Sequence, residues 1–150
     1  DPIPTGHWDF PPPFGRQEVV GELTTVDVIT IARHLAKNNI DAFLNLAPVR
    51  DLTNPDTPPP QAADAEGRSA QVFCLDVVVR RGDETRRLAV HGKDIYAVTA
   101  PIVVEAVERL LEGRYRRNGL GTAGEIFDAC EFLHAMNDDG YVHVQEASRS

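Results

Sequence analysis

Cysteine, positive charge and long hydrophobic runs are all scarce in this sequence of 150 residues. Its two cysteines, Cys74 and Cys130, each stand among apolar residues, which predicts reduced thiols in the core rather than a disulfide framework. No two of the five histidines have i, i+4 spacing, and the two cysteines are isolated from each other, so no metal site is predicted. Burial of apolar surface must therefore hold the domain together, and the cysteine usage favours a cytoplasmic protein.

Basic residues are outnumbered by acidic ones. Lysine and arginine number 15 against 23 aspartates and glutamates, giving a formal net charge of -8 and an isoelectric point near 5.0. Binding to nucleic acid or to an anionic membrane requires a concentrated basic surface, so neither partner is expected. No apolar run approaches the roughly 18 residues of a membrane span, and no signal peptide is recognisable. The start at Asp1 without methionine suggests a piece of a longer protein, or a processed chain.

Proline and aromatic residues crowd residues 1–16. This segment contains Trp8, Phe10 and Phe14 among prolines, which cannot donate hydrogen bonds to a sheet and do not continue a helix. We therefore predict an extended arm that forms neither ladder nor helix. Its aromatic side chains are expected to fill a groove, either on the body of this domain or on a neighbouring domain.

Hydrophobic periodicity predicts a single α+β domain over residues 17–150. The predicted helices span about 25–38, 99–112 and 122–136. The predicted strands span about 17–23, 40–46, 69–79, 84–97 and 141–145. The proline-rich, acidic stretch at about 51–68 predicts a long flexible loop. Together these elements predict a mixed, largely antiparallel sheet around a central hairpin at about 69–97, packed by about three helices.

The central hairpin turns at Gly82–Asp83. If this is a two-residue turn, the numbers of paired residues sum to 165, which places Cys74 opposite His91 and Val77 opposite Leu88. A longer turn would shift the register.

The three predicted helices are amphipathic. We expect these residues to be buried: Val28, Ile31, Ala32 and Leu35 in the first helix; Ile102, Val103, Ala106, Val107, Leu110 and Leu111 in the second; Ile126, Ala129, Cys130, Leu133 and Met136 in the third. Thr99 is the expected N-cap of the second helix, with Pro101 in its first turn and Gly113 at its end. Thr122 and Glu125 have capping-box spacing.

A glycine-rich run precedes the third helix. Gly119, Gly121 and Gly124 spell GxGxxG, which binds a dinucleotide when it joins a buried strand to a helix. Here the run follows a polar segment, so a helix-capping loop is the favoured interpretation. The neighbouring basic cluster either clamps an anion or, as is more common, is a solvated helix end; it comprises Arg114, Arg116 and Arg117.

Two places along the hairpin suit the binding of a small substrate. His91 lies near the end of a central strand, where an imidazole can exchange protons with a substrate, although structural histidines are more common. The run GRSAQ at 67–71 brings Arg68 and Gln71 to the start of the hairpin. It is either a corner that binds a carboxylate or an amide, or the anchor of the long loop.

Three blocks of sequence resemble one known family. They are GRSAQVF at 67–73, GKDIYAVTAPIVVEAVERLL at 92–111 and TAGEIFDACEFL at 122–133. In order and spacing they are similar to the second domain of saccharopine dehydrogenase-like proteins, especially bacterial ones of the saccharopine reductase and trans-acting enoyl reductase type. The run WDFPPPFG resembles the segment that precedes these blocks.

The resemblance implies an α+β C-terminal domain that helps to form the substrate cleft and the dimer contact of an oxidoreductase. In that family a Rossmann domain comes first and supplies the NAD(P) site, and no strand followed by GxGxxG opens this chain. The resemblance therefore implies NAD(P) for the full-length protein, no cofactor in this chain, and little activity in isolation. The implied partners are the N-terminal Rossmann domain and a second copy in a homodimer.

Five residues are predicted to line the substrate cleft: Arg68, Gln71, His91, Tyr96 and Thr99. No residue is assigned a catalytic role. Two alternatives stay open. The chain is a stand-alone interaction or dimerisation module, or it is a small enzyme that uses His91 and Tyr96 as acid and base without a cofactor.

Overall fold

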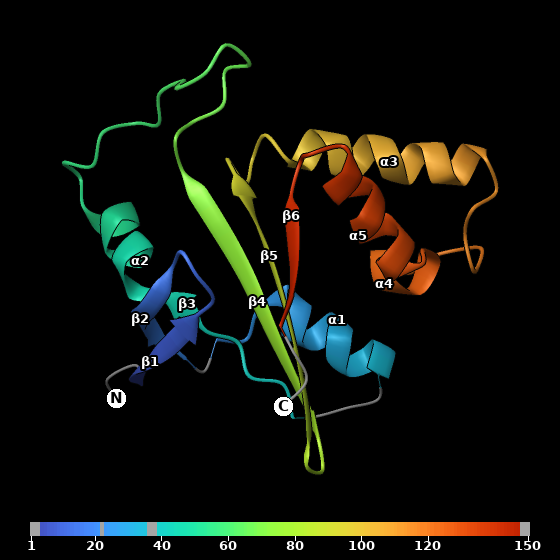
Figure 1. Cartoon of the computed structure of the whole chain (residues 1–150), viewed down its shortest axis with the longest axis horizontal. Coiled ribbons are helices and arrows are strands. Elements are labelled where there is room, and N and C mark those ends of the chain that lie inside the picture. Colours follow the sequence, from blue (N-terminus) through green and yellow to red (C-terminus); the bar gives the residue numbers. More distant parts are fainter. Residues whose placement is uncertain (1–3, 22, 36–38, 148–150) are drawn as a thin grey trace. The chain divides into compact units, whose positions relative to one another are not determined.

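The protein has an α+β fold, as the sequence predicts. The computed structural model describes residues 4–21, 23–35 and 39–147, and their contacts divide the chain into two compact units, Asp1–Pro59 and Pro60–Ser150 (Figure 1). Each unit contains a three-stranded antiparallel sheet. The prediction placed an arm before one domain, whereas the contacts place the division within the proline-rich loop, where few residues can pair across it.

The first unit begins with a hairpin. Its elements are β1 (Thr5–Phe10), β2 (Gly15–Val20), α1 (Val26–Leu35), β3 (Leu44–Asn45) and α2 (Leu46–Thr53). β1 and β2 pair along their full length with Trp8 opposite Gln17, so the prediction that the arm forms no ladder is wrong. The prolines at 11–13 lie in the turn, where a missing N–H removes no ladder bond. Trp8 stacks on Phe43 of the same unit, with ring centroids 5.6 Å apart.

The helices of the first unit differ from the prediction in burial and in number. α1 is found where a helix was predicted, but Ile31 and Leu35 are exposed, so their predicted burial is wrong. The predicted helix end at 36–38 lies outside the described residues. The strand predicted over 40–46 pairs only at Leu44–Asn45, and α2 follows at once, because Asn45 is an extended N-cap and Pro48 is tolerated in a first helical turn.

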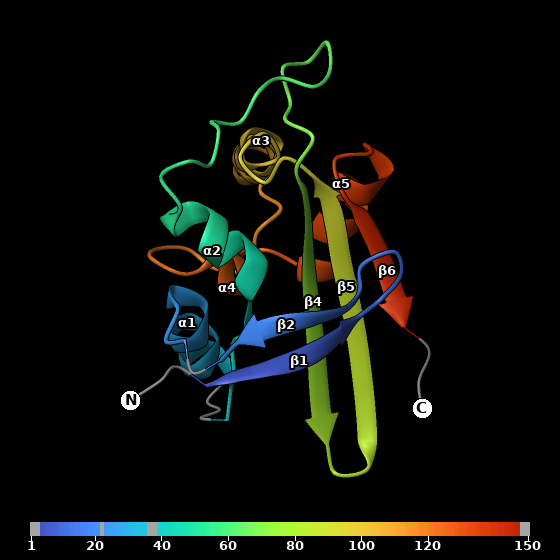
Figure 2. The same ribbon diagram turned by 90° about the vertical axis from the view of Figure 1, so that its left-hand side faces the viewer.

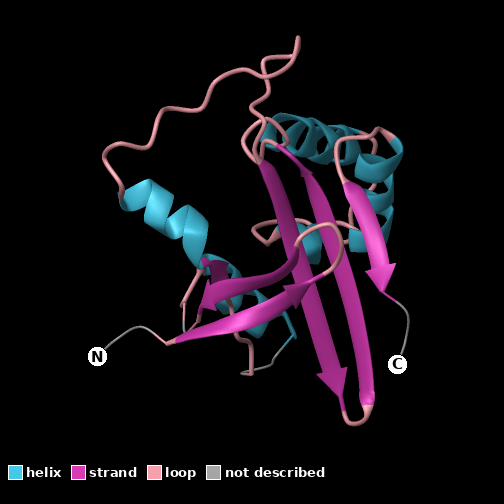
Figure 3. Ribbon diagram, turned by 60° about the vertical axis from the view of Figure 1, so that its left-hand side comes forward, coloured by secondary structure: helices cyan, strands magenta, loops and turns pink. Residues whose placement is uncertain are grey.

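The second unit is built on the predicted hairpin. Its elements are β4 (Val72–Arg81), β5 (Glu84–Lys93), α3 (Thr99–Leu111), α4 (Ala123–Ile126), α5 (Ala129–Asp138) and β6 (His143–Ala147). The predicted register is confirmed, since Cys74 pairs with His91 and Val77 pairs with Leu88. β6 pairs with the other edge of β5 from Arg87 to His91, and Figure 3 shows the turn of the hairpin extending past β6.

One end of this sheet carries the hydrophobic core of the second unit. The buried core residues are Val98, Met136 and Val142, and the partly buried residues packed on them are Phe73, Val90, Phe132 and Val144. Figure 2 shows α3 nearly end-on beside the end of β5, with α5 close to the same end of the sheet.

α3 packs through the face that was predicted to be exposed. Arg109 is only 3% exposed, whereas Leu111 is 82% exposed and Val107 is 48% exposed, so the predicted burial of the apolar stripe is wrong. Arg109 can be buried because its guanidinium has partners for both charge and donors: Nε donates to Glu105 Oε1 at 2.6 Å, and Nη2 donates to the Glu131 carbonyl oxygen at 3.1 Å. The apolar stripe of α3 is left without cover in the described structure.

The third predicted helix is divided in two. The capping box at Thr122 and Glu125 is confirmed and starts α4, but α4 ends after one turn. Asp128 then caps α5 by accepting hydrogen bonds from the amides of Cys130 and Glu131. Cys130 therefore lies in the exposed first turn of α5, and the prediction that it is a core thiol is wrong.

Candidate functional site

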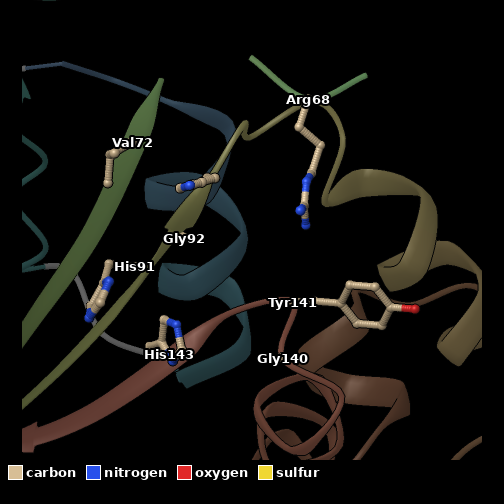
Figure 4. Close-up of a pocket in the computed structure, with 8 residues that line it drawn as sticks. Arg68, Val72, His91, Gly92, Gly140, Tyr141 and His143 are labelled. Atoms are coloured by element: carbon tan, nitrogen blue, oxygen red, sulfur yellow. The ribbon is translucent and has the colours of Figure 1, made fainter. Parts of the chain in front are cut away.

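A hollow of about 240 Å³ lies at the end of the β4–β5–β6 sheet (Figure 4). The residues that line it are Arg68, Val72, His91, Gly92, Lys93, Gly140, Tyr141 and His143. Four of these side chains can carry a positive charge, and none is acidic. The lining is therefore basic although the chain has a net charge of -8.

The two histidines of the hollow are brought together by the strand pairing. His91 of β5 is directly opposite His143 of β6, and opposed residues of an antiparallel pair point to the same face of the sheet. Their ring centroids are 5.3 Å apart and the ring planes are inclined by 40°. Figure 4 shows the two imidazoles side by side, while the Tyr141 ring is directed away from them.

Cys74 of β4 is opposite His91 on its other side and completes a row across three strands. Burial raises the pKa of the Cys74 thiol, and the nearby carboxylate of Asp76 raises it further. Reactive cysteines require a lowered pKa, so this thiol is not prepared to act as a nucleophile. Asp76 itself is held by a two-point ion pair with Arg87, with distances of 2.9 and 2.6 Å.

Asp94 fixes the turn that follows the hollow. It is the described non-glycine residue with a positive φ, 51°, and its backbone N–H donates to the Gln71 carbonyl at 2.8 Å. Its carboxylate accepts the amides of Ser69 at 2.7 Å, Ala97 at 3.0 Å and Tyr96 at 3.1 Å. These backbone hydrogen bonds, that from Ser69 above all, lower the pKa of Asp94. One carboxylate thus ties the start of β4 to the end of β5.

Arg68 reaches the hollow from a compact turn of the long loop. Its backbone N–H and its Nε both donate to the Asp64 carboxylate, at 2.9 and 2.8 Å, and Nη2 pairs with Glu66 at 3.3 Å. The hydrogen bond and charge of Asp64 raise the pKa of Arg68. The hydrogen bond from the Arg68 backbone N–H, followed by that from its side chain, lowers the pKa of Asp64. Figure 4 shows the guanidinium extended toward the Gly140–Tyr141 turn. Arg68 therefore both anchors the loop and lines the hollow.

The structure brings two of the five predicted cleft residues together. Arg68 and His91 line the hollow, but Gln71, Tyr96 and Thr99 do not. Tyr96 is 81% exposed on the turn after Asp94. The N-cap of α3 is Val98, so the prediction that Thr99 is the N-cap is wrong. The Thr99 hydroxyl donates to the Ile95 carbonyl at 3.1 Å.

Sequence reasoning missed the contribution of β6 to the hollow. His143 joins His91 only through the pairing of β6 with β5, and no local signal in the sequence specifies that pairing. Lys93 lay close to His91 in the sequence, and the alternation of strand side chains would have placed both on one face.

The other sequence motifs are accounted for by local structure. The GxGxxG run extends into α4, a helix of four residues that contains Gly124, and it follows turns rather than a buried strand, so it does not fit a dinucleotide. All three arginines beside it are paired with carboxylates: Arg114 with Glu112 at 2.6 Å, Arg116 with Asp128, and Arg117 with Glu125 at 3.1 Å. Within the described ranges, no three histidine, cysteine or acidic side chains are grouped to hold a metal ion.

Comparison of the chain with models of protein families, with curated proteins and with solved structures found no match. In the part of the chain that the structure describes, no helix has both the length and the apolar character needed to cross a bilayer.

Proposed function

We propose that this chain is the substrate-cleft and dimerisation domain of a saccharopine dehydrogenase-like, NAD(P)-dependent oxidoreductase. The observation that carries the proposal is the hollow, where two of the three resembling blocks meet. Arg68 comes from the first block, and Gly92 and Lys93 come from the second. A concave site with few convergent polar groups is where a small substrate is expected to bind.

The cofactor belongs to another domain in this proposal. The only GxGxxG run of the sequence does not have the strand and long helix that a pyrophosphate site requires. The chain's own residues would then shape and charge one wall of the cleft. The preceding domain would bind NAD(P), which supplies or accepts the hydride.

The reading frame upstream of Asp1 provides the first test. A strand, a glycine-rich turn and a helix encoded there would support the proposal, and an initiating methionine directly before Asp1 would contradict it. Titration of NADPH into the 150-residue chain provides the second test. We expect no saturable change in NADPH fluorescence, because the dinucleotide site is assigned to the missing domain.

The exposed stripe of α3 supports the dimerisation part of the proposal, and it equally suits a stand-alone interaction module. Contiguous exposed apolar residues commonly mark a contact with another protein surface. We expect the double variant Val107→Glu, Leu111→Glu to be monomeric by light scattering, whereas the parent chain is dimeric. Glu108→Gln, on the polar side of the same helix, is the matched control and should stay dimeric. A monomeric parent chain would contradict this part of the proposal.

A further inference from the structure

We propose that the hollow binds a small oxyanion, such as a carboxylate, sulfate or phosphate group, between His91, His143 and Lys93, and that binding strengthens when the two imidazoles are protonated. This inference goes beyond the proposed function and does not depend on it. It rests on the charges and geometry of the hollow, whichever larger protein contains the chain.

The groups that face the hollow come from β4, β5, β6, the long loop and the turn before β6, which contributes the uncharged Tyr141. β4 contributes the uncharged Val72 and, two pairs further along, the Cys74 thiol. β5 contributes His91 and Lys93, and β6 contributes His143. The long loop contributes a guanidinium that is already balanced by two carboxylates. No lining residue supplies a negative charge.

Lys93 gives the hollow its permanent positive charge. Among the described residues, no carboxylate lies within ion-pair distance of this ammonium group. The nearest carboxylate in the sequence is Asp94, whose oxygens are taken by three backbone amides. Lys93 is exposed at the rim, where an arriving anion can reach it.

The histidine pair makes the site sensitive to pH. Histidine changes charge between about pH 5 and pH 8, and two protonated imidazoles with centroids 5.3 Å apart repel each other. An oxyanion between them relieves this repulsion and accepts hydrogen bonds from both rings. Each unit of charge added within about 4 Å of an anion strengthens its binding about fivefold in water-like surroundings. Protonation of both rings is therefore expected to strengthen binding by well over tenfold.

A metal ion is a weaker match to the same pair of rings. Cross-strand imidazoles can bind a transition metal, but the nearby ammonium and guanidinium groups oppose a divalent cation. The third group in the row is a thiol with a raised pKa, which resists the deprotonation that metal binding requires. The surroundings thus favour an anion.

Sulfate is a suitable probe, because its charge stays constant across the range in which histidine titrates. The histidine ring signals of the 150-residue chain would be followed by NMR during sulfate titrations at about pH 5.5 and about pH 8, with chloride at equal ionic strength as the reference. We expect saturable shifts of the His91 and His143 rings, with affinity at least about tenfold higher at the lower pH. Parallel titrations with acetate and inorganic phosphate would show whether the site prefers a planar or a tetrahedral anion.

Variants separate the site from general surface charge. His143→Gln should reduce the pH effect to about fivefold, because only the His91 ring then gains a charge, and Lys93→Gln should weaken binding at both pH values. His134→Gln is the matched control, because His134 is an exposed residue of α5 outside the hollow and should not matter. Circular dichroism checks that each variant is folded. Absence of saturable shifts, equal affinity at both pH values, or an equal effect of His134→Gln would overturn the proposal and leave the oxidoreductase proposal untouched.

Discussion

Replacement of Arg109 by methionine tests whether its buried guanidinium, paired with Glu105 within α3, also holds α3 against α5. The guanidinium is bonded to the Glu105 carboxylate and to the Glu131 carbonyl, and it lies 5.2 Å from the centre of the Phe132 ring. Methionine keeps most of the packing of the aliphatic stem but removes the charge and the donors. The carboxylate of Glu105, whose side chain is 14% exposed, is then left with only Arg114 at 3.8 Å.

The expected cost follows from the burial of this pair. Removal of one partner of a buried ion pair costs about 3–5 kcal/mol, and the remaining contact with Arg114 puts the expected loss for Arg109→Met near the lower end, about 3 kcal/mol. Adding Glu105→Leu removes the stranded charge, so the double variant should recover at least half of that loss. Arg86→Met is the matched control. Its ion pair with Glu84 is exposed, so the expected change is within about 0.5 kcal/mol.

Urea denaturation followed by far-UV circular dichroism measures these differences. Because the chain has two compact units, hydrogen exchange of the α3 and α5 amides should accompany it, so that the loss is assigned to the second unit. Trp8 lies in the first unit, and its fluorescence serves as an internal reference. A loss below about 1 kcal/mol, or a double variant less stable than Arg109→Met, would refute the reasoning.

Three further predictions concern the same unit. Gly92→Ala should destabilise the second unit by about 1–3 kcal/mol, because the new Cβ would lie 3.1 Å from the Phe73 ring and from the Tyr141 carbonyl oxygen. Gly124→Ala is the control and should cause no such loss, because a Cβ there has nothing within 4 Å. Urea denaturation of both variants measures the difference. Asp94→Asn should lower the melting temperature at neutral pH. Because the folded-state pKa of Asp94 is lowered, the stabilisation by its carboxylate is complete above the unfolded pKa of about 3.9 and is lost as the pH falls through the folded pKa. The melting temperatures of the parent chain and of Asp94→Asn should therefore converge in acid. Cys130 should react with iodoacetamide faster than Cys74, as peptide mass spectrometry will show, and equal rates would contradict the burial and pKa assigned to Cys74.

The register of the central hairpin was predictable because it is a local property. Gly82 and Asp83 specify a two-residue turn, and that turn fixes every pair along both strands. The position of His143 was not predictable in the same way. It depends on which edge of the sheet β6 joins, and short strands carry little information about their partners.

The burial of α3 shows the limit of hydrophobic periodicity. The pattern identified the apolar stripe but could not show which face contacts α5. Hydrophobic periodicity counts Arg109 as polar, and it does not show that Glu105 one turn earlier and the distant Glu131 carbonyl satisfy its charge and donors. The sequence also predicted Thr99 as the N-cap of α3, whereas the N-cap is Val98 and Asp94 organises the preceding turn through its carboxylate and its positive φ.

The hairpin in the first unit was missed because the prediction considered how many prolines residues 1–16 contain, and not where those prolines lie. Prolines oppose a ladder only where their nitrogen would have to donate, and here the run at 11–13 occupies the turn. Membership of the candidate site likewise depends on where each residue lies in the fold. Arg68 and His91 were identified from residue type, but only the fold shows that Tyr96 lies outside the hollow.

The bond between Asp94 and the Ser69 amide closes the hairpin at its open end, as Gly82–Asp83 closes it at the other. The hairpin between Ser69 and Asp94 is thus fixed at both ends, by this hydrogen bond and by the two-residue turn. If a residue is inserted into β4 or β5, the two strands cannot shift register along their whole length to accommodate it. The insertion would therefore separate His91 from His143 or from Lys93. We therefore expect related sequences to differ in length before Asp64 and at the hairpin tip, and to keep the spacing between Ser69 and Asp94 wherever that tip is unchanged.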